Sequence, residues 1–160
     1  MEHLAAAFLV DAKWFFLETG PDWVWKDLVA PTLTSGLLIR DGDSETINSM
    51  LRRAASTAKA MHRLQNMEIW NSGAGHACVF RYQQKNWKAN LTWRGNWELT
   101  LEPDVIRAWE DVAKQRPLRV FDATTEIMGE NVVIKWHGDA IKALDFCHQL
   151  RVPLRQCKPI

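Results

Sequence analysis

The sequence predicts an α+β fold: a mixed, mainly antiparallel sheet of about five or six strands, with two or three helices packed mostly on one face. Two patterns predict it. Residues 90–99 alternate, with Leu91 and Trp93 on one face of an extended chain and Arg94 on the other. Residues 44–63 instead repeat their apolar side chains at helical spacing. Strands and helices are therefore both expected within one chain.

The N-terminal part is expected to contain a helix and a strand. Residues 3–17 favour a short amphipathic helix or a bent segment, and a loop follows around Pro21. Residues 32–40 are expected to be a strand, which ends at the Asp-Gly-Asp turn over 41–43.

The most regular helical pattern follows that turn. Asp43 or Ser44 can cap a helix over 44–63. Its buried stripe is formed by the apolar residues Ile47, Met50, Leu51, Ala54, Ala58 and Met61.

The centre of the sheet is predicted from three strand-like segments close together in the sequence. They cover residues 67–70, 77–83 and 90–99. Two glycines in 71–75 allow the positive φ angles of a tight turn. The polar residues 84–89 are short enough to join the last two strands as an antiparallel hairpin.

The C-terminal part adds a helix, two strands and a last short helix. A helix over 103–115 begins with Pro in its first turn, which is where Pro is tolerated. Strands are expected at 118–122 and 131–136, on either side of a polar turn over 124–130. A short helix over 138–147 follows. The helices 44–63 and 103–115 are expected to pack on the same face of the sheet.

Composition is that of one globular domain covering residues 1–160. Of its residues 47% are hydrophobic, 24% are charged and the net charge is +1, so no global field favours nucleic acid or an anionic membrane. The apolar run near the N-terminus is too short to span a bilayer. Cys78, Cys147 and Cys157 have no short pair spacing, which favours free thiols in the cytoplasm. We expect no metal, no cofactor, no nucleic acid and no membrane partner.

Three blocks of the chain resemble a known family. They are MEIWN…GHACVFRY…LTWRGNW within 67–97, VIRAWEDVA within 103–113 and HGDAI within 136–144. Over about residues 23–153, the chain resembles a fungal domain of unknown function that usually forms the C-terminal part of longer F-box or leucine-rich-repeat-like proteins. The resemblance implies a fungal origin and transfers no activity or catalytic residue. Because the domain begins near residue 1 here, we expect it to stand alone.

Two histidines are candidate catalytic groups. His76 follows the glycine turn, where it could act as a general acid or base or simply bond to backbone in the loop. His137 and Asp139 flank Gly138 and could form a functional pair, although Asp139 also suits a helix cap.

Two arginines are candidates for holding an anionic group. Arg81 and Arg94 project from neighbouring strands of the predicted hairpin, and together they could hold a carboxylate. The alternative is cross-strand pairing with Glu68 or Glu98.

Tryptophan is unusually frequent, with nine Trp against a single Tyr. The candidate substrate-binding residues are the aromatic side chains of the central strands, Trp70, Tyr82, Trp93 and Trp97. Strand alternation limits this idea, since Trp93 and Trp97 share one face and Arg94 takes the other. A single cavity could hold them all only with a kink at Gly95. Without the kink, we expect the tryptophan face to be core and the Arg94 face to carry the function.

Motifs for a nucleophile, a phosphate loop or a metal site are missing, which leaves two hypotheses. The first, which we favour, is a small cofactor-independent enzyme of specialised metabolism. It would bind a hydrophobic polycyclic precursor in a Trp-lined pocket and promote a cyclisation or pericyclic reaction by positioning it. The second is a protein-interaction module derived from F-box or leucine-rich-repeat-like proteins, with exposed tryptophans as anchors. A closed Trp-lined cavity favours the enzyme, and a flat aromatic patch favours the module.

Overall fold

The computed structural model describes residues 3–20 and 22–146. Their strands form a six-stranded sheet in the order β1-β2-β3-β4-β5-β6. The strands β1 to β3 pair in parallel, β3 to β5 pair antiparallel, and β6 is parallel to β5. Their bounds are β1 (His3–Asp11), β2 (Ala30–Thr34), β3 (Asn66–Gly73), β4 (His76–Lys85), β5 (Lys88–Gly95) and β6 (Val120–Ile127). The predicted α+β class, a mixed sheet with an antiparallel centre, is confirmed.

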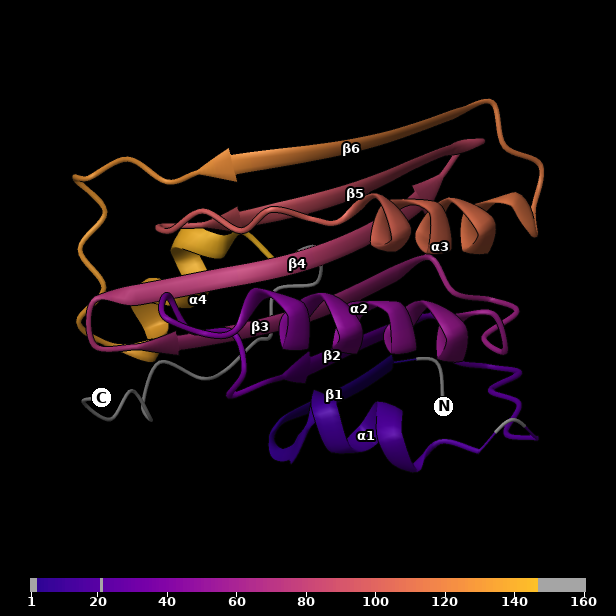
Figure 1. The fold of residues 1–160 in the computed structure, drawn as a ribbon, viewed down its shortest axis with the longest axis horizontal. Coiled ribbons are helices and arrows are strands. Elements are labelled where there is room, and N and C mark those ends of the chain that lie inside the picture. Colours follow the sequence, from indigo (N-terminus) through magenta and orange to yellow (C-terminus); the bar gives the residue numbers. More distant parts are fainter. Residues whose placement is uncertain (1–2, 21, 147–160) are drawn as a thin grey trace.

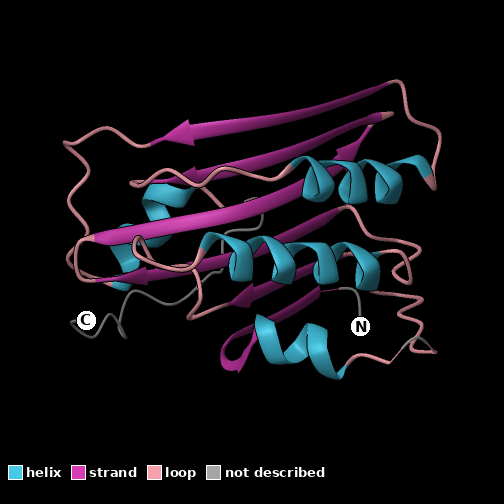
Figure 2. Cartoon of the chain, viewed as in Figure 1, coloured by secondary structure: helices cyan, strands magenta, loops and turns pink. Residues whose placement is uncertain are grey.

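Helices cover both faces of the sheet unequally. The helices of the described residues are α1 (Ala12–Glu18), α2 (Ser44–Ala58), α3 (Pro103–Lys114) and α4 (His137–Leu144). Figures 1 and 2 show α1, α2 and α3 together on one face and α4 on the other. Each of the first three helices connects two parallel strands, and each connection steps across the sheet in the same direction. Right-handed crossovers of this kind place all three helices on one face.

The main core lies between the sheet and the helices α1 to α3. Met50, Leu51, Trp109 and Val112 are all buried in it, as predicted for the helices 44–63 and 103–115. The Trp109 indole Nε1 donates a hydrogen bond to the Leu51 carbonyl at 3.1 Å, which ties α3 to α2 and satisfies a buried donor. A second, smaller core lies under α4 on the opposite face.

The helix predicted over residues 3–17 is wrong in its first half. Residues His3–Asp11 form the edge strand β1, and only Ala12–Glu18 are helical. A short apolar run does not distinguish strand from helix by periodicity, and pairing with β2 decides the outcome. Asp11 marks the change: its carboxylate accepts from Lys13 N at 2.8 Å and so caps α1.

Two further boundaries differ from the prediction. The strand predicted at 32–40 ends at Thr34, because the chain turns there so that Ser35 Oγ and Gly36 N can donate to the Asp11 carboxylate at 2.9 and 2.7 Å. The loop predicted at 84–89 is only two residues long, Asn86 and Trp87. Its remaining residues continue the ladder between β4 and β5.

The strand predicted at 131–136 and the polar turn predicted at 124–130 are wrong. The chain forms strand β6 through Thr124 to Ile127, and residues 131–135 are irregular. The physical reason is that β6 is exposed along its length. The strand predicted at 118–122 overlaps only the start of β6, where Phe121 packs against the main core. The remaining residues of β6 bury neither face and have no hydrophobic alternation from which a strand could be predicted. The helix predicted at 138–147 is α4; Cys147 and Cys157 lie outside the described residues.

Candidate functional site

The turn between β4 and β5 has a backbone conformation that its residues do not favour. Asn86 and Trp87 have φ angles of 51° and 61°, as in a two-residue type I′ turn, which is usually Asn-Gly. Asn tolerates this left-handed conformation, but for Trp it costs about 1–2 kcal/mol. Burial does not offset the cost, because Trp87 is 55% exposed. Strain retained at an exposed aromatic residue points to a functional role.

Trp87 is fixed in place by the segment that leads into β6. Arg119 N donates to the Trp87 carbonyl at 2.8 Å. The Arg119 guanidinium also lies over the indole, with its carbon 5.1 Å from the ring centroid, in a cation–π contact. One face of the indole is thereby occupied, while the side chain as a whole stays accessible to a ligand.

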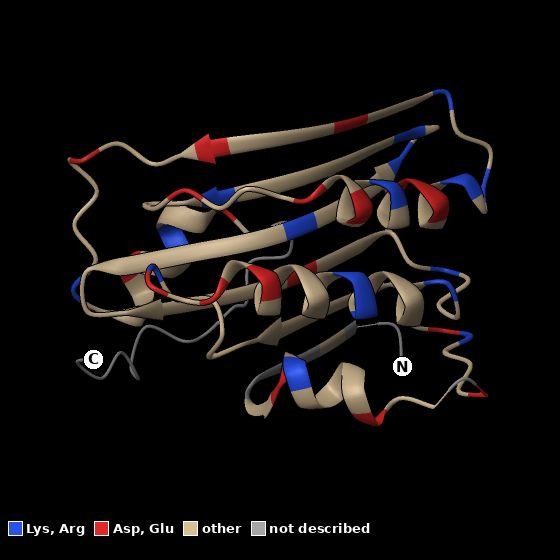
Figure 3. Cartoon of the chain, viewed as in Figure 1, with Lys and Arg blue, Asp and Glu red and all other residues tan. Residues whose placement is uncertain are grey.

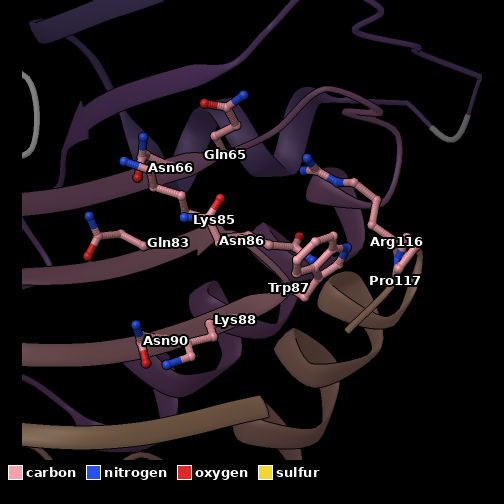
Figure 4. A pocket seen from close by; sticks show the side chains of 11 residues that line it. Gln65, Asn66, Gln83, Lys85, Asn86, Trp87, Lys88, Asn90, Arg116 and Pro117 are labelled. Carbon is pink, nitrogen blue, oxygen red and sulfur yellow. The ribbon is translucent and has the colours of Figure 1, made fainter. Parts of the chain in front are cut away.

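Positive charge surrounds this turn. Lys85 and Lys88 lie directly opposite each other as the pair that closes the hairpin. Like charges in such a pair are destabilising, and an anion between them would relieve the repulsion. Arg116 lies beside Trp87 in Figure 4, just beyond the end of α3. Figure 3 shows these basic segments gathered at the hairpin end of the sheet, although the whole chain has a net charge of only +1.

A row of polar side chains extends from the turn across the sheet. Asn66, Gln83, Asn90 and Asp122 occupy one register row on β3, β4, β5 and β6. The row lies on the face opposite α1, α2 and α3, because the alternate residues of these strands enter the main core. Figure 4 shows its three amide side chains on neighbouring strands. Amides both donate and accept hydrogen bonds, so this surface can bind a polar chain.

The turn, Arg116 and the three amides line an open hollow of about 900 Å³, while Arg119 and Asp122 lie outside its lining. Its lining, which we call the hairpin-end site, consists of Gln65, Asn66, Gln83, Gln84, Lys85, Asn86, Trp87, Lys88, Asn90, Arg116 and Pro117. The lining contains no carboxylate, imidazole, thiol or hydroxyl side chain, so it has few groups for acid–base or nucleophilic chemistry. Its chemistry is that of binding: cations, amides and one exposed indole.

Gln84 connects the hairpin-end site to the core. Its Oε1 accepts from Tyr82 Oη at 2.7 Å, and its Nε2 donates to the Ala113 carbonyl at 3.0 Å. The second bond holds the C-terminal turn of α3 against β4. Arg116 follows that turn, so Gln84 fixes the segment that brings this cation to the site.

The four aromatic residues predicted to bind substrate are buried in the cores. Trp93, Trp97 and Tyr82 belong to the main core, where the rings of Trp93 and Trp97 meet at 4.8 Å. Trp70 lies in the second core, with its ring 5.2 Å from that of Phe146. Gly95 does not kink the strand to bring these side chains into one cavity. Strand β5 ends at Gly95, and the Gly95 Cα lies so close to Cys78 that an added methyl group would not fit. As expected without the kink, the tryptophan face of β5 is core.

The two predicted arginines bind the end of α4. Arg81 Nε bonds to Glu68 Oε1 at 2.8 Å in a buried ion pair, which is the cross-strand alternative. Its Nη2 donates to the carbonyls of Leu144 and Asp145, both at 2.8 Å. Arg94 Nε donates to the Ala143 carbonyl at 3.0 Å, and its Nη1 pairs with Glu126. Both cations thus satisfy carbonyls at the negative end of a helix.

The histidines also have structural surroundings. The His76 ring packs on Gly73, where a side chain would collide with it. His137 Nδ1 is 2.8 Å from Ser72 Oγ. Asp139 Oδ2 accepts from Trp136 N at 3.1 Å and caps α4, which is the helix-cap alternative. The catalytic roles proposed for these residues stay predictions.

Sequence reasoning did not single out the hairpin-end site. The available signal was the Lys-Asn-Trp-Lys sequence over 85–88, in which two like charges flank a candidate Asn turn. Overestimating the loop length hid the fact that Trp87 occupies the position that favours glycine.

The described residues give two further findings. None of their helices is both long and apolar enough to cross a bilayer. None of their His, Cys, Asp and Glu side chains form a group of three or more that could hold a metal ion.

Comparison with known proteins places the chain in a family without assigning it an activity. No curated protein matches the chain. A family model described as "Family of unknown function (DUF6546)" matches residues 1–150 of the 160. The chain belongs to this family of unknown function.

Proposed function

We propose that this chain is a protein-interaction module, and that the hairpin-end site binds an acidic segment of a partner protein. The observation that carries the proposal is Trp87, an exposed indole held in an unfavourable backbone conformation among Lys85, Lys88, Arg116 and Arg119. Trp and Arg are the residue types most often found to dominate binding energy at protein interfaces. Carboxylates of the partner would lie between the lysines, and an apolar or aromatic side chain would pack on Trp87.

The amide row supports a peptide as the ligand. Asn66, Gln83 and Asn90 place amide side chains in one line across three strands, and amides are the side chains that can both donate to and accept from a polypeptide backbone. A long polyanion suits the surface less well. Asp122 continues the same row, and Glu126 lies further along β6, so a nucleic-acid backbone that followed the sheet would meet like charge, whereas the carboxylates of a peptide need lie only at the lysine end of the row. Binding of single-stranded nucleic acid also typically uses several stacked aromatic residues, whereas Trp87 is the one aromatic residue of this lining.

The cofactor-independent enzyme has less support. That hypothesis needs a Trp-lined cavity, and Trp70, Trp93 and Trp97 are packed inside cores. Exposed tryptophans favour the module, and in the described residues Trp14, Trp23 and Trp87 are each more than half exposed. A fungal origin and a derivation from F-box or leucine-rich-repeat-like proteins belong to this proposal as well.

Binding of an acidic peptide tests the proposal. The probe is a fluorescein-labelled peptide of glutamates with a central phenylalanine, titrated with the full chain and followed by fluorescence anisotropy. We expect saturable binding that weakens with added salt, because exposed charges are screened beyond about 8–10 Å. Lys85→Gln/Lys88→Gln and Trp87→Gly should each weaken it about tenfold, or ~1.4 kcal/mol. Lys135→Gln removes an exposed lysine outside the site and should leave it unchanged.

Two outcomes contradict the proposal. One is equal binding of the peptide to the wild type and to the site variants. The other is tighter binding of single-stranded oligothymidine than of the acidic peptide, with loss in the same variants, which would make the site a nucleic-acid surface.

A further inference from the structure

Strand β6 is an edge of the sheet and is exposed along its whole length. Every residue of it is exposed except Phe121, which is half-buried. Its pairing with β5 runs without a break from its first residue to its last. It contains neither Pro nor Lys, residues that commonly protect an edge. The opposite edge differs, since the register of β1 shifts between Ala6 and Asp11. The regular, unprotected edge is therefore β6.

The backbone of β6 leaves a full set of hydrogen-bonding groups on its outer side. Val120 N and Met128 N donate to the carbonyls of Trp87 and Gly95 on the β5 side. Residues of a strand alternate in the direction of their N–H and C=O groups. The outward-directed residues are consequently the odd-numbered ones, Phe121, Ala123, Thr125 and Ile127.

The side chains along this edge give it an acidic character. Asp122 and Glu126 project on the face opposite α3, and Figure 3 shows these two acidic positions on β6 with no Lys or Arg between them. Glu126 pairs with Arg94 at 2.8 Å and its side chain is still 52% exposed. On the α3 side, Glu98 borders a hollow next to β6. Charge complementarity therefore favours a basic strand.

A small groove with mixed lining accompanies the edge on the α3 side. This hollow of about 250 Å³ lies between β6 and α3 and is lined by the apolar residues Leu99, Leu101, Ile106 and Ala123 and by the polar residues Glu98, Thr100, Thr124 and Thr125. Side chains on this side of an added strand would enter the groove, while those on the other side would meet Asp122 and Glu126. Successive residues of a strand point to opposite faces. A strand suits both surfaces when its apolar residues contact Leu101, Ile106 and Ala123 in the groove and its basic residues face Asp122 and Glu126.

We infer that β6 is a docking edge for an extended segment of a partner protein in which apolar residues alternate with Lys or Arg. The segment adds a strand to the sheet, as in peptide recognition by β-augmentation. Its main chain bonds to the outward groups of β6, its apolar residues fill the groove and its cations pair with Asp122 and Glu126. This surface takes a ligand of opposite charge to that of the hairpin-end site and adjoins that site's amide row at Asp122, which pairs with Asn90.

A second copy of this chain fits the edge poorly. Two β6 strands paired around a two-fold axis would each present the same acidic residues and no basic one. Centred on Thr124, such a pair would place Asp122 opposite Glu126 of the other copy, which is destabilising.

The probe for this edge is a fluorescein-labelled peptide of sequence Val-Lys-Val-Lys-Val-Lys-Val, followed by anisotropy, with Val-Glu-Val-Glu-Val-Glu-Val as its counterpart. Ala123→Pro removes an outward N–H that β5 does not use, and Pro is tolerated on an edge with that orientation. It should weaken binding of the lysine peptide about tenfold. Asp122→Lys should weaken it about fivefold, consistent with one cross-strand ion pair. Asp111→Lys is the matched charge control, an exposed acid on α3, and should bind as the wild type does.

Each possible result either supports or overturns the assignment of β6 as a docking edge. Selective binding of the lysine peptide, lost in Ala123→Pro and Asp122→Lys with native circular dichroism, supports the docking edge. If Ala123→Pro does not fold, Asp122→Lys and the glutamate peptide still decide. No saturable binding to the wild type, or equal binding of both peptides, overturns the inference. So does a dimer, seen by analytical ultracentrifugation, that Ala123→Pro dissociates, because the edge would then serve a second copy. Binding of the acidic peptide at the hairpin-end site is tested separately, by Lys85→Gln/Lys88→Gln and Trp87→Gly, so failure of the docking edge leaves that proposal standing.

Discussion

The Arg119 guanidinium lies over the indole of Trp87, 5.1 Å from the ring centroid, and both residues are held by the start of β6. Arg119 N bonds to the Trp87 carbonyl at 2.8 Å, so backbone and side chain together fix a tryptophan whose φ angle is 61°. The positive φ angle of Trp87 lowers the stability of the protein, and a glycine at position 87 would avoid this cost. That relation between stability and binding can be measured.

Trp87→Gly should make the protein more stable. The substitution removes a left-handed conformation that costs a non-glycine residue about 1–2 kcal/mol, and it loses a cation–π contact of about 0.5–1 kcal/mol. We expect a gain of roughly 0.5–1 kcal/mol in the free energy of unfolding, measured by urea denaturation. The same variant should lose the acidic peptide. A less stable Trp87→Gly would mean that the indole contributes packing, and the case for functional strain would fail.

Trp109→Ala should destabilise the main core strongly. Trp109 is fully buried, its ring centroid is 5.0 Å from that of Tyr82, and its Nε1 bonds to Leu51 O. Loss of a large buried ring costs about 3–5 kcal/mol. Trp14→Ala is the matched control, because this side chain is 56% exposed and its loss should cost less than ~0.5 kcal/mol. Equal melting temperatures of the two variants would contradict the packing of α2 and α3.

The elements that the sequence predicted are those that pack on the main core. α2 and β5 show a clear period because each buries one side, and β3 and β4 pack one face on the main core and the other on the second core. α3 also packs on the main core, and its Pro103 begins the helix as expected. The strands β1 and β6 lack that signal: they lie at the edges, where pairing with a neighbour decides the conformation. Tertiary contacts at the edges are not encoded in local alternation.

The site was less predictable than the fold for a related reason. Frequent tryptophan suggested a cavity, but Trp93 and Trp97 are buried in the main core and Trp70 in the second core. What distinguishes Trp87 is its backbone conformation and its exposure, which follow from a two-residue turn. The turn length depends on the register of Lys85 with Lys88, and composition does not determine register.

Cys78 should make stability depend on alkaline pH. Burial raises the pKa of the Cys78 thiol to about 12. Above its unfolded value near 9.0, the unfolded chain loses this proton while the folded chain keeps it. The folded pKa is the higher one, so the stabilisation is complete below about pH 9 and is lost as the pH rises toward 12.

Comparison of the wild type with Cys78→Ala isolates this effect. Each pH unit above 9 should cost the wild type at most about 1.4 kcal/mol more than the variant. We therefore expect the stability advantage of the wild type to shrink between about pH 8 and pH 10, measured by urea unfolding at both values. Cys78 in the folded wild type should also resist thiol reagents at neutral pH. Rapid labelling without unfolding would show that the thiol is accessible.

The ion pair between Glu68 and Arg81 supports the second core, and its two members should behave differently. Arg81→Met leaves the Glu68 carboxylate buried without its cation and frees the carbonyls of Leu144 and Asp145. Removing one partner of a buried pair costs about 3–5 kcal/mol. Glu68→Gln keeps an acceptor for Arg81 Nε and leaves both carbonyl bonds intact, so it should cost about 1–2 kcal/mol.

Hydrogen exchange should show faster exchange in α4 for Arg81→Met and not for Glu68→Gln, because α4 depends on the guanidinium itself. Arg107→Met, at an exposed pair with Asp104, serves as control and should change stability by less than ~0.5 kcal/mol. Equal protection of α4 in all three variants would show that Arg81 does not hold the helix, and the Arg94 bond to Ala143 would then be its main attachment to the sheet.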